Sequence, residues 1–143
     1  MDYASLMNSA GNFVEPTLSS TQGAAQAAIM NSRSTTNNGT TTAAAAGLPS
    51  GDQSWTNVSL LDPPGADSYP IASFSYLLLY KELSNNIDSI EKARALAEFV
   101  NWAITDRHQF ASILYYVPLS DSILQHNQQT LRSLIFNGQP VFQ

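Results

Sequence analysis

The chain has 143 residues, 43% hydrophobic and 12% charged, which is typical of a globular protein with uncharged polar loops and excludes a charged disordered tail. Its six basic residues are scattered and are outnumbered by eleven acidic ones, for a net charge of -5. This argues against nucleic-acid binding, because no basic patch can neutralise a phosphate backbone. No cysteine is present, which excludes disulfide partners, thiolate nucleophiles and thiolate metal sites.

The start of the chain predicts a hairpin followed by a helix. Short apolar groups at residues 3–7 and 12–15 flank a polar turn, a pattern that favours a hairpin or two short strands. Ser19 with Gln22 three places on forms a capping-box pattern. It predicts a short Ala-rich helix that reaches about Met30.

The middle of the chain predicts a loop and two strands. Residues 31–47 carry only Arg33 as a charge and nothing bulky to bury, so we expect a flexible surface insertion. Residues 55–61 alternate apolar with small polar residues, as a half-buried strand does, and the turn residues 62–65 follow. The aromatic and aliphatic density of residues 69–80 fits a strand entering a buried sheet.

The clearest predicted helix starts near Asp88, which with Glu91 has capping-box spacing. Its apolar residues recur at helical intervals and should face a core; they are Ala93, Leu96, Ala97, Val100, Ala103 and Ile104. We see no internal repeat in the chain. The segment as a whole predicts an amphipathic helix with charges on its wet side.

The end of the chain predicts two more helical pieces. One covers about residues 107–114 and is ended by the extended residues 116–119. Ser120, Asp121 and Ser122 then cap a last helix, whose inward side chains should be Leu124, Leu131, Leu134 and Ile135. Gly138 and Pro140 end that helix, leaving Val141 and Phe142 as a tail strand or a packing tail.

Two pairs of side chains are candidates for a metal site or for catalysis. His108 and His126 stand eighteen positions apart without a second ligand at i+3 or i+4, which is poor metal spacing and favours two solvent-facing helix residues. Glu91 and Glu98 lie seven apart on one helix face, where a glycosidase pair could be imagined. An amphipathic helix needs such charges anyway, so the structural interpretation is favoured.

Hydroxyl clusters at two predicted helix starts could bind an oxyanion through backbone N–H groups. They are Ser19, Ser20 and Thr21, and Ser120, Asp121 and Ser122. The same residues are ordinary N-caps, and Asp121 would repel an anion, so capping is favoured. The acceptor patterns at Asn38 and Asn57 occur by chance in so polar a chain. Without a phosphate loop, nucleophile elbow or metalloprotease motif, residue chemistry predicts an α/β or α+β fragment with no site.

A distributed set of stretches resembles the C-terminal region of the phosphate-specific transport substrate-binding proteins. It begins with Tyr3-Ala-Ser-Leu6 and Gly11-Asn-Phe-Val-Glu-Pro-Thr17. It continues in order with Ser54-Trp-Thr-Asn-Val-Ser-Leu-Leu61, Ser68-Tyr-Pro-Ile71, Leu77-Leu-Leu-Tyr-Lys81, Phe99-Val-Asn-Trp-Ala103, Tyr116-Val-Pro-Leu119, Asp121-Ser-Ile123 and Phe136-Asn-Gly-Gln-Pro-Val-Phe142. The resemblance covers nearly everything except the insertion.

The resemblance implies an α/β fold: the incomplete C-terminal portion of a two-lobed, periplasmic-binding-protein-like (type II) fold. Residues 1–68 would be the remainder of the second lobe. Residues 69–143 would be a return strand near the hinge and the C-terminal helices of the first lobe. Two positions depart from the family, since Arg107 and Tyr115 stand where relatives commonly have glycine. Because left-handed backbone is costly without glycine, we expect the helix breaks near Asp106 and Leu114 to shift or disappear.

The resemblance also implies a function, that of the phosphate-capturing component of an ABC importer, with inorganic phosphate and the permease subunits as partners. It implies no enzymatic activity, no cofactor and no metal, and an extracytoplasmic location for the intact protein. The family's ligand residues lie upstream of the matched region, so no phosphate-binding residue is carried over. The first residues lack a basic start and an apolar run, so no secretory signal is expected. The alternative is a non-binding structural remnant that needs a separate N-terminal half.

Overall fold

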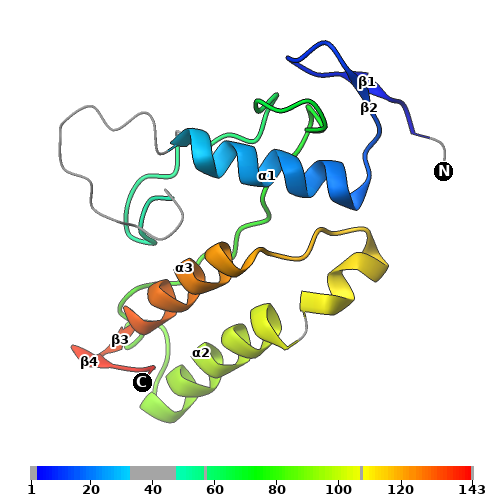
Figure 1. The fold of residues 1–143 in the computed structure, drawn as a ribbon. Coiled ribbons are helices and arrows are strands. Elements are labelled where there is room, and N and C mark those ends of the chain that lie inside the picture. Colours follow the sequence, from blue (N-terminus) through cyan, green and yellow to red (C-terminus); the bar gives the residue numbers. More distant parts are fainter. Residues whose placement is uncertain (1–2, 33–47, 57, 107, 143) are drawn as a thin grey trace.

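A computed structural model describes residues 3–32, 48–56, 58–106 and 108–142. Its elements are β1 (Leu6–Met7), β2 (Phe13–Val14), α1 (Leu18–Ser32), α2 (Ile90–Thr105), the 3-10 helix η2 (His108–Leu114), α3 (Asp121–Arg132), β3 (Ile135–Phe136) and β4 (Gln139–Pro140). In Figure 1 the hairpin β1–β2 and α1 form one part, and α2, η2, α3 and the hairpin β3–β4 form the other. None of the helices described is long and apolar enough to cross a membrane. The described chain is therefore mixed helix with small two-stranded sheets.

The predicted N-terminal hairpin and helix are confirmed. β1 pairs antiparallel with β2, Leu6 opposite Val14. The helix cap differs from the prediction, because Thr17 and not Ser19 is the N-cap. The Ser20 N–H donates to the Thr17 hydroxyl at 3.1 Å, and the Thr17 N–H donates to the Ser20 hydroxyl at 3.0 Å. This is the reciprocal geometry of a capping box, with serine in the place of glutamate.

Asn8 joins the hairpin to the loop that contains the turn residues 62–65. Its side-chain N–H groups donate to the carbonyl oxygens of Gly65, Ala66 and Ser68 at 2.9–3.2 Å. Its side-chain oxygen accepts from the N–H groups of Ala10 and Asn12. Asn8 is buried, so this one side chain holds together segments more than fifty residues apart.

The two predicted strands of the middle region are wrong. Within residues 55–61 and 69–80 the described residues show a single pairing, the isolated antiparallel bridge between Leu61 and Ile71. The sequence there has the composition of strands, but a strand needs a neighbour that accepts its hydrogen bonds. The predicted insertion, residues 31–47, lies mostly outside the described residues, with Asn31 and Ser32 ending α1.

The C-terminal part has its own core. α2 presents Ala93, Ala97 and Val100 to it, as predicted. The cluster is completed by Leu83, Leu131, Leu134 and Val141. The α2 cap lies one residue beyond the predicted one, since the Ser89 hydroxyl accepts from the Lys92 N–H, whereas Asp88 forms an ion pair with Lys92. Small residues on α2 let it approach α3 and the C-terminal tail, which confirms Val141 as a packing residue.

The helix breaks near Asp106 and Leu114 neither shift nor disappear in the described residues, so the expectation that they would is wrong. α2 ends at Thr105 with Asp106 as C-cap, and η2 ends at Leu114. Tyr115 follows it in the left-handed region at φ 60°, a conformation that costs a non-glycine residue roughly 1–2 kcal/mol. The surrounding chain therefore imposes this break although glycine is absent. Arg107 lies outside the described residues.

α3 is confirmed with Ser120 as N-cap, although the Ser120 side chain makes no cap hydrogen bond. Of the predicted inward residues, Leu131 and Leu134 are buried, whereas Leu124 and Ile135 are half-buried. Ile135 starts the hairpin β3–β4, which the sequence analysis did not predict. Its two-residue turn is Asn137-Gly138, with φ of 48° and 73°, the signature of a type I′ turn.

Candidate functional site

The described residues contain no group of three or more His, Asp or Glu side chains able to hold a metal ion. Glu91 and Glu98 are both exposed on α2. Hydrogen bonds to its own backbone N–H and to Ser89 hold the pKa of Glu91 below its usual value, as expected for a carboxylate at a helix N-terminus. The structural interpretation of this pair is therefore favoured by its surroundings.

The hydroxyl cluster at α1 forms a side-chain cap, whereas the one at α3 is bonded internally. Ser20 donates to the Glu15 carbonyl at 2.6 Å and takes part in the α1 capping box. The hydroxyls of Ser120 and Ser122 lie 3.1 Å apart and hydrogen bond to each other. Asn38 and Asn57 lie outside the described residues, and nothing is described of the His108 side chain.

The prediction that His126 faces solvent is wrong. His126 is buried on the inward side of α3, and its ring meets that of Trp55 at a centroid distance of 5.8 Å. Its Nε2 atom has no hydrogen-bond partner among the residues that the structure describes. His126 follows Ile123 by three places and precedes Leu134 by eight, so helical periodicity alone could have placed it on the buried face.

Burial of His126 predicts a stability that falls in mild acid. Desolvation lowers the pKa of His126 below 6.5, and the hydrogen bond to the Pro49 carbonyl only partly opposes this. Stability from the neutral ring is present above pH 6.5 and is lost as pH falls through the lowered folded-state value. We expect the urea midpoint to fall between pH 7 and pH 5, and to fall less in His126→Leu. An equal fall in both proteins would contradict the assignment.

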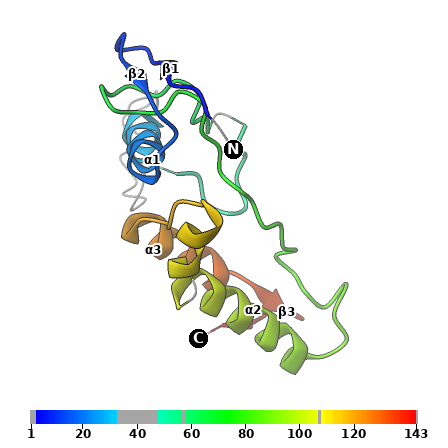
Figure 2. The same ribbon diagram turned by 90° about the vertical axis from the view of Figure 1, so that its right-hand side faces the viewer.

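The most unusual surface of the molecule is a run of exposed apolar side chains on an extended segment, residues 72–80, hereafter the open segment. Tyr76, Leu77, Leu78 and Tyr80 are all exposed, Leu78 by 90%. The open segment carries no charged residue. Figure 2 shows the chain here running along one side of the molecule, from the part with α1 to the part with α2.

Strand-like pairing is present at both ends of the open segment and absent between them. Ahead of it, Leu61 pairs with Ile71, and the Asp62 N–H donates to the Pro70 carbonyl at 2.8 Å. Beyond it, Glu82 pairs in parallel with Ile135 of β3. Among the hydrogen bonds of the described residues, none is donated by a backbone N–H of residues 72–80.

The far end of the open segment is fixed by Glu82. Its carboxylate accepts from the N–H and hydroxyl of Ser84, and from the N–H groups of Asn137 and Gly138 in the β3–β4 turn. These bonds, led by that of the Ser84 hydroxyl, lower the pKa of Glu82 to about 2. The carboxylate thus stays ionised near neutral pH and holds this end against β3.

Two cavities flank the open segment. One, of about 420 Å³, lies toward α1 and is lined by Gln22, Ile71, Phe74 and the turn at Tyr115. The other, of about 930 Å³, lies toward α2 and α3 and is lined by Leu77, Leu79, Val100 and Leu131. Protein interiors are close-packed. An apolar opening of this size beside the core is therefore a place where further side chains fit.

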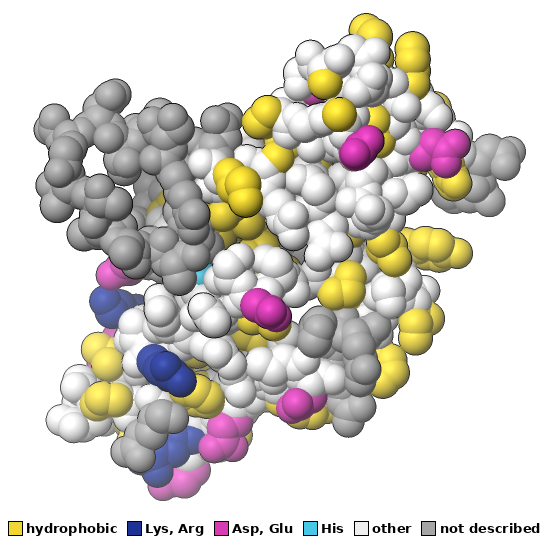
Figure 3. Space-filling model, viewed as in Figure 1, with side chains coloured by type: hydrophobic (Ala, Val, Ile, Leu, Met, Phe, Trp, Pro, Cys, Tyr) yellow, Lys and Arg dark blue, Asp and Glu magenta, His cyan; other side chains and the backbone are white. Residues whose placement is uncertain are grey.

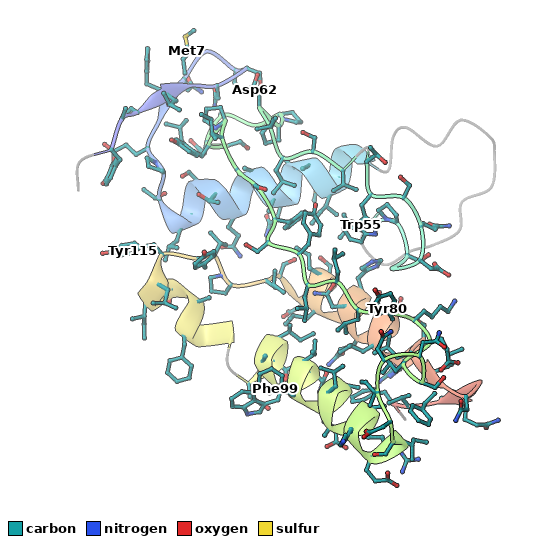
Figure 4. The ribbon with its side chains drawn as sticks, turned by 180° about the vertical axis from the view of Figure 1, so that it is seen from behind. Met7, Trp55, Asp62, Tyr80, Phe99 and Tyr115 are labelled. Carbon is teal, nitrogen blue, oxygen red and sulfur yellow. The ribbon has the colours of Figure 1, made fainter. Side chains whose placement is uncertain are left out.

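The chemistry of this surface suits a polypeptide better than a small anion. Tyr76 packs edge-on against Trp55 at a centroid distance of 5.8 Å (Trp55 and Tyr80 are labelled in Figure 4). At its rim an ion pair joins Lys81 to Asp52 at 3.1 Å. On the opposite face, seen in Figure 3, the coloured Lys and Arg side chains lie at the lower left, and hydrophobic side chains are spread over much of the described surface.

The chain is similar to two curated proteins, both named phosphate-binding protein PstS. The one from Methanocaldococcus jannaschii is 29% identical over 105 residues, which is 72% of this chain and 23% of that protein. The one from Pasteurella multocida is 30% identical over 126 residues, which is 88% of this chain and 30% of that protein. The chain thus spans less than a third of the length of either relative. No family model matches the chain, and neither does any solved structure.

Proposed function

We propose that the chain is a C-terminal portion of the substrate-binding component of a phosphate ABC importer, and that it does not hold phosphate without the remaining portion. The observation that carries this is the similarity to phosphate-binding proteins over 72% and 88% of the chain. The intact protein captures inorganic phosphate outside the cytoplasm and delivers it to the permease subunits. It catalyses no reaction and needs no cofactor.

The local chemistry supports the second half of the proposal. Phosphate is held in proteins by convergent backbone N–H groups, hydroxyls and cationic side chains. In the described residues the hydroxyls of Thr17, Ser20, Ser120 and Ser122 at the two helix starts are engaged in local hydrogen bonds. Lys81 and Lys92 each pair with an aspartate. We therefore propose that this chain supplies scaffold and hinge elements of the family's two-lobed fold and does not supply phosphate ligands.

A second candidate function is that of a structural remnant, which joins a separate N-terminal half to form a protein that does not bind phosphate. The observation that favours it is the open segment, where Leu77 and Leu78 are exposed and no backbone N–H donates a hydrogen bond among the described residues. The two candidates differ in whether the completed protein binds phosphate.

Calorimetry with inorganic phosphate tests the proposal. The 143-residue chain should give no saturable heat. A covalent fusion of this chain to the Pasteurella multocida relative, with the relative's own aligned stretch deleted, should bind phosphate one to one. The deleted relative alone and a titration with sulfate serve as controls.

Each outcome of the calorimetry decides between the candidates. One-to-one binding by the chain alone would contradict the statement that it lacks a phosphate site. A folded fusion that gives no heat with phosphate would reject phosphate capture and leave the structural remnant as the better candidate.

A further inference from the structure

We infer that the open segment is an acceptor for strand addition, and that its occupant is an extended, uncharged segment of the remaining portion of the phosphate-binding protein. This rests on the proposed function, which supplies the identity of that portion. It goes further by naming the residues, the bonding and the faces through which the two portions join.

The backbone of the open segment is already prepared for pairing. Its neighbours at both ends, Ile71 and Glu82, are in strand-type bridges, and residues 72–80 between them form neither a helix nor a turn. The N–H groups between them have no partner among the described residues. A row of unpaired N–H and C=O groups on extended backbone is a template for another strand.

The side chains indicate that both faces of the open segment are covered when the added strand is bound. Successive side chains of extended backbone point to opposite sides, and the adjacent Leu77 and Leu78 are 69% and 90% exposed. An apolar residue on each face is typical of a strand inside a sheet covered on both sides. The open segment therefore has the side chains of an interior strand without the neighbours of one.

The occupant follows from charge, space and length. A segment without charge is flanked by openings of about 420 and 930 Å³ that are lined mostly by apolar surface, and Lys81 and Asp52 beside the larger one are paired with each other. It is complementary to uncharged, apolar strands. The similar phosphate-binding proteins extend well beyond the region that this chain matches, since it covers only 23% and 30% of them. Their remaining portion is thus polypeptide of ample length to supply such a strand.

The test mixes the full chain, unfused, with the Pasteurella multocida relative from which the aligned stretch has been deleted. Light scattering on a sizing column should show a one-to-one complex. Hydrogen exchange at residues 75–80 should slow on the order of a hundredfold or more on mixing, because paired core amides exchange only through opening of the structure. The double variant Leu77→Pro, Leu78→Pro removes one N–H from each edge and should weaken the complex at least about tenfold.

Matched variants separate docking from folding. Leu77→Asp should weaken the complex, and Leu114→Asp should not, although both leucines are 69% exposed. The thermal unfolding of the unmixed chain should be unchanged by the Leu77 and Leu78 variants, because no backbone N–H of residues 72–80 donates a hydrogen bond among the described residues. It should be unchanged by Leu114→Asp because that side chain is exposed. Leu77→Ala with Leu78→Ala retains both N–H groups and should bind better than the double proline variant.

Some results would overturn the inference. It fails if no complex forms, if the double proline variant binds as tightly as the unaltered chain, or if residues 75–80 pair instead in a dimer of this chain. A complex that depends on the open segment but gives no heat with phosphate leaves the inference intact and rejects phosphate capture. A phosphate-binding complex insensitive to both prolines rejects only strand addition.

Discussion

Replacing Asn8 by aspartate is expected to lower the free energy of unfolding by about 3 kcal/mol. The amide of Asn8 donates to three backbone carbonyls in residues 65–68, and aspartate would present an acceptor to each of them. Buried polar groups left without partners cost about 1–3 kcal/mol apiece, and more when one is charged. Urea unfolding followed by far-ultraviolet circular dichroism measures the loss.

The control for Asn8 is Asn12→Asp. Asn12 is exposed and donates to only one of the same carbonyls, that of Ala66 at 3.1 Å. Its replacement should cost less than about 1 kcal/mol. Equal losses in the two variants would mean that burial and the number of bonds at Asn8 do not set its importance.

Truncating Leu131 to alanine should destabilise the C-terminal part by about 2–5 kcal/mol, the range for leucine in a packed core. Leu131 is only 4% exposed and belongs to the cluster of α2, α3 and the tail. The same truncation at Leu78, which is 90% exposed, should change stability by less than about 0.5 kcal/mol. Chemical denaturation of both variants makes the comparison.

The outcome at Leu78 is as informative as that at Leu131. A loss of more than about 1 kcal/mol at Leu78 would mean that the open segment is packed in the isolated chain, contrary to its exposure. If Leu131→Ala were as stable as the unaltered chain, the cluster around α2 would not be the core of the C-terminal part.

Local signals in the sequence predicted most of the helices and the first hairpin. The caps at Thr17 and Ser89 lie within two residues of the predicted ones, because a cap depends on neighbours three residues away. The burial of Ala93 and Ala97 followed from helical periodicity. The β3–β4 hairpin could have been predicted too, since Asn137-Gly138 is the strongest short hairpin signal.

The rest depended on contacts that no local pattern contains. The apolar density of residues 69–80 predicted burial in a sheet, yet Leu77 and Leu78 are exposed, because burial of a strand requires neighbours from elsewhere. The prediction for His126 rested on metal-ligand spacing, which contains no information about the face of α3 on which the ring lies. It therefore did not include the contact with Trp55. Two-lobe organisation and the division at residue 68 stay predictions.

The composition of the open segment also affects the aggregation of this chain when it is produced alone. From Phe74 to Tyr80 it holds neither proline nor a charged residue, and four of its large apolar side chains face water. Short, uncharged, β-prone segments with these properties nucleate cross-β fibrils. The residues proposed to accept a strand are therefore expected to promote self-assembly of the isolated chain and to limit its concentration in solution.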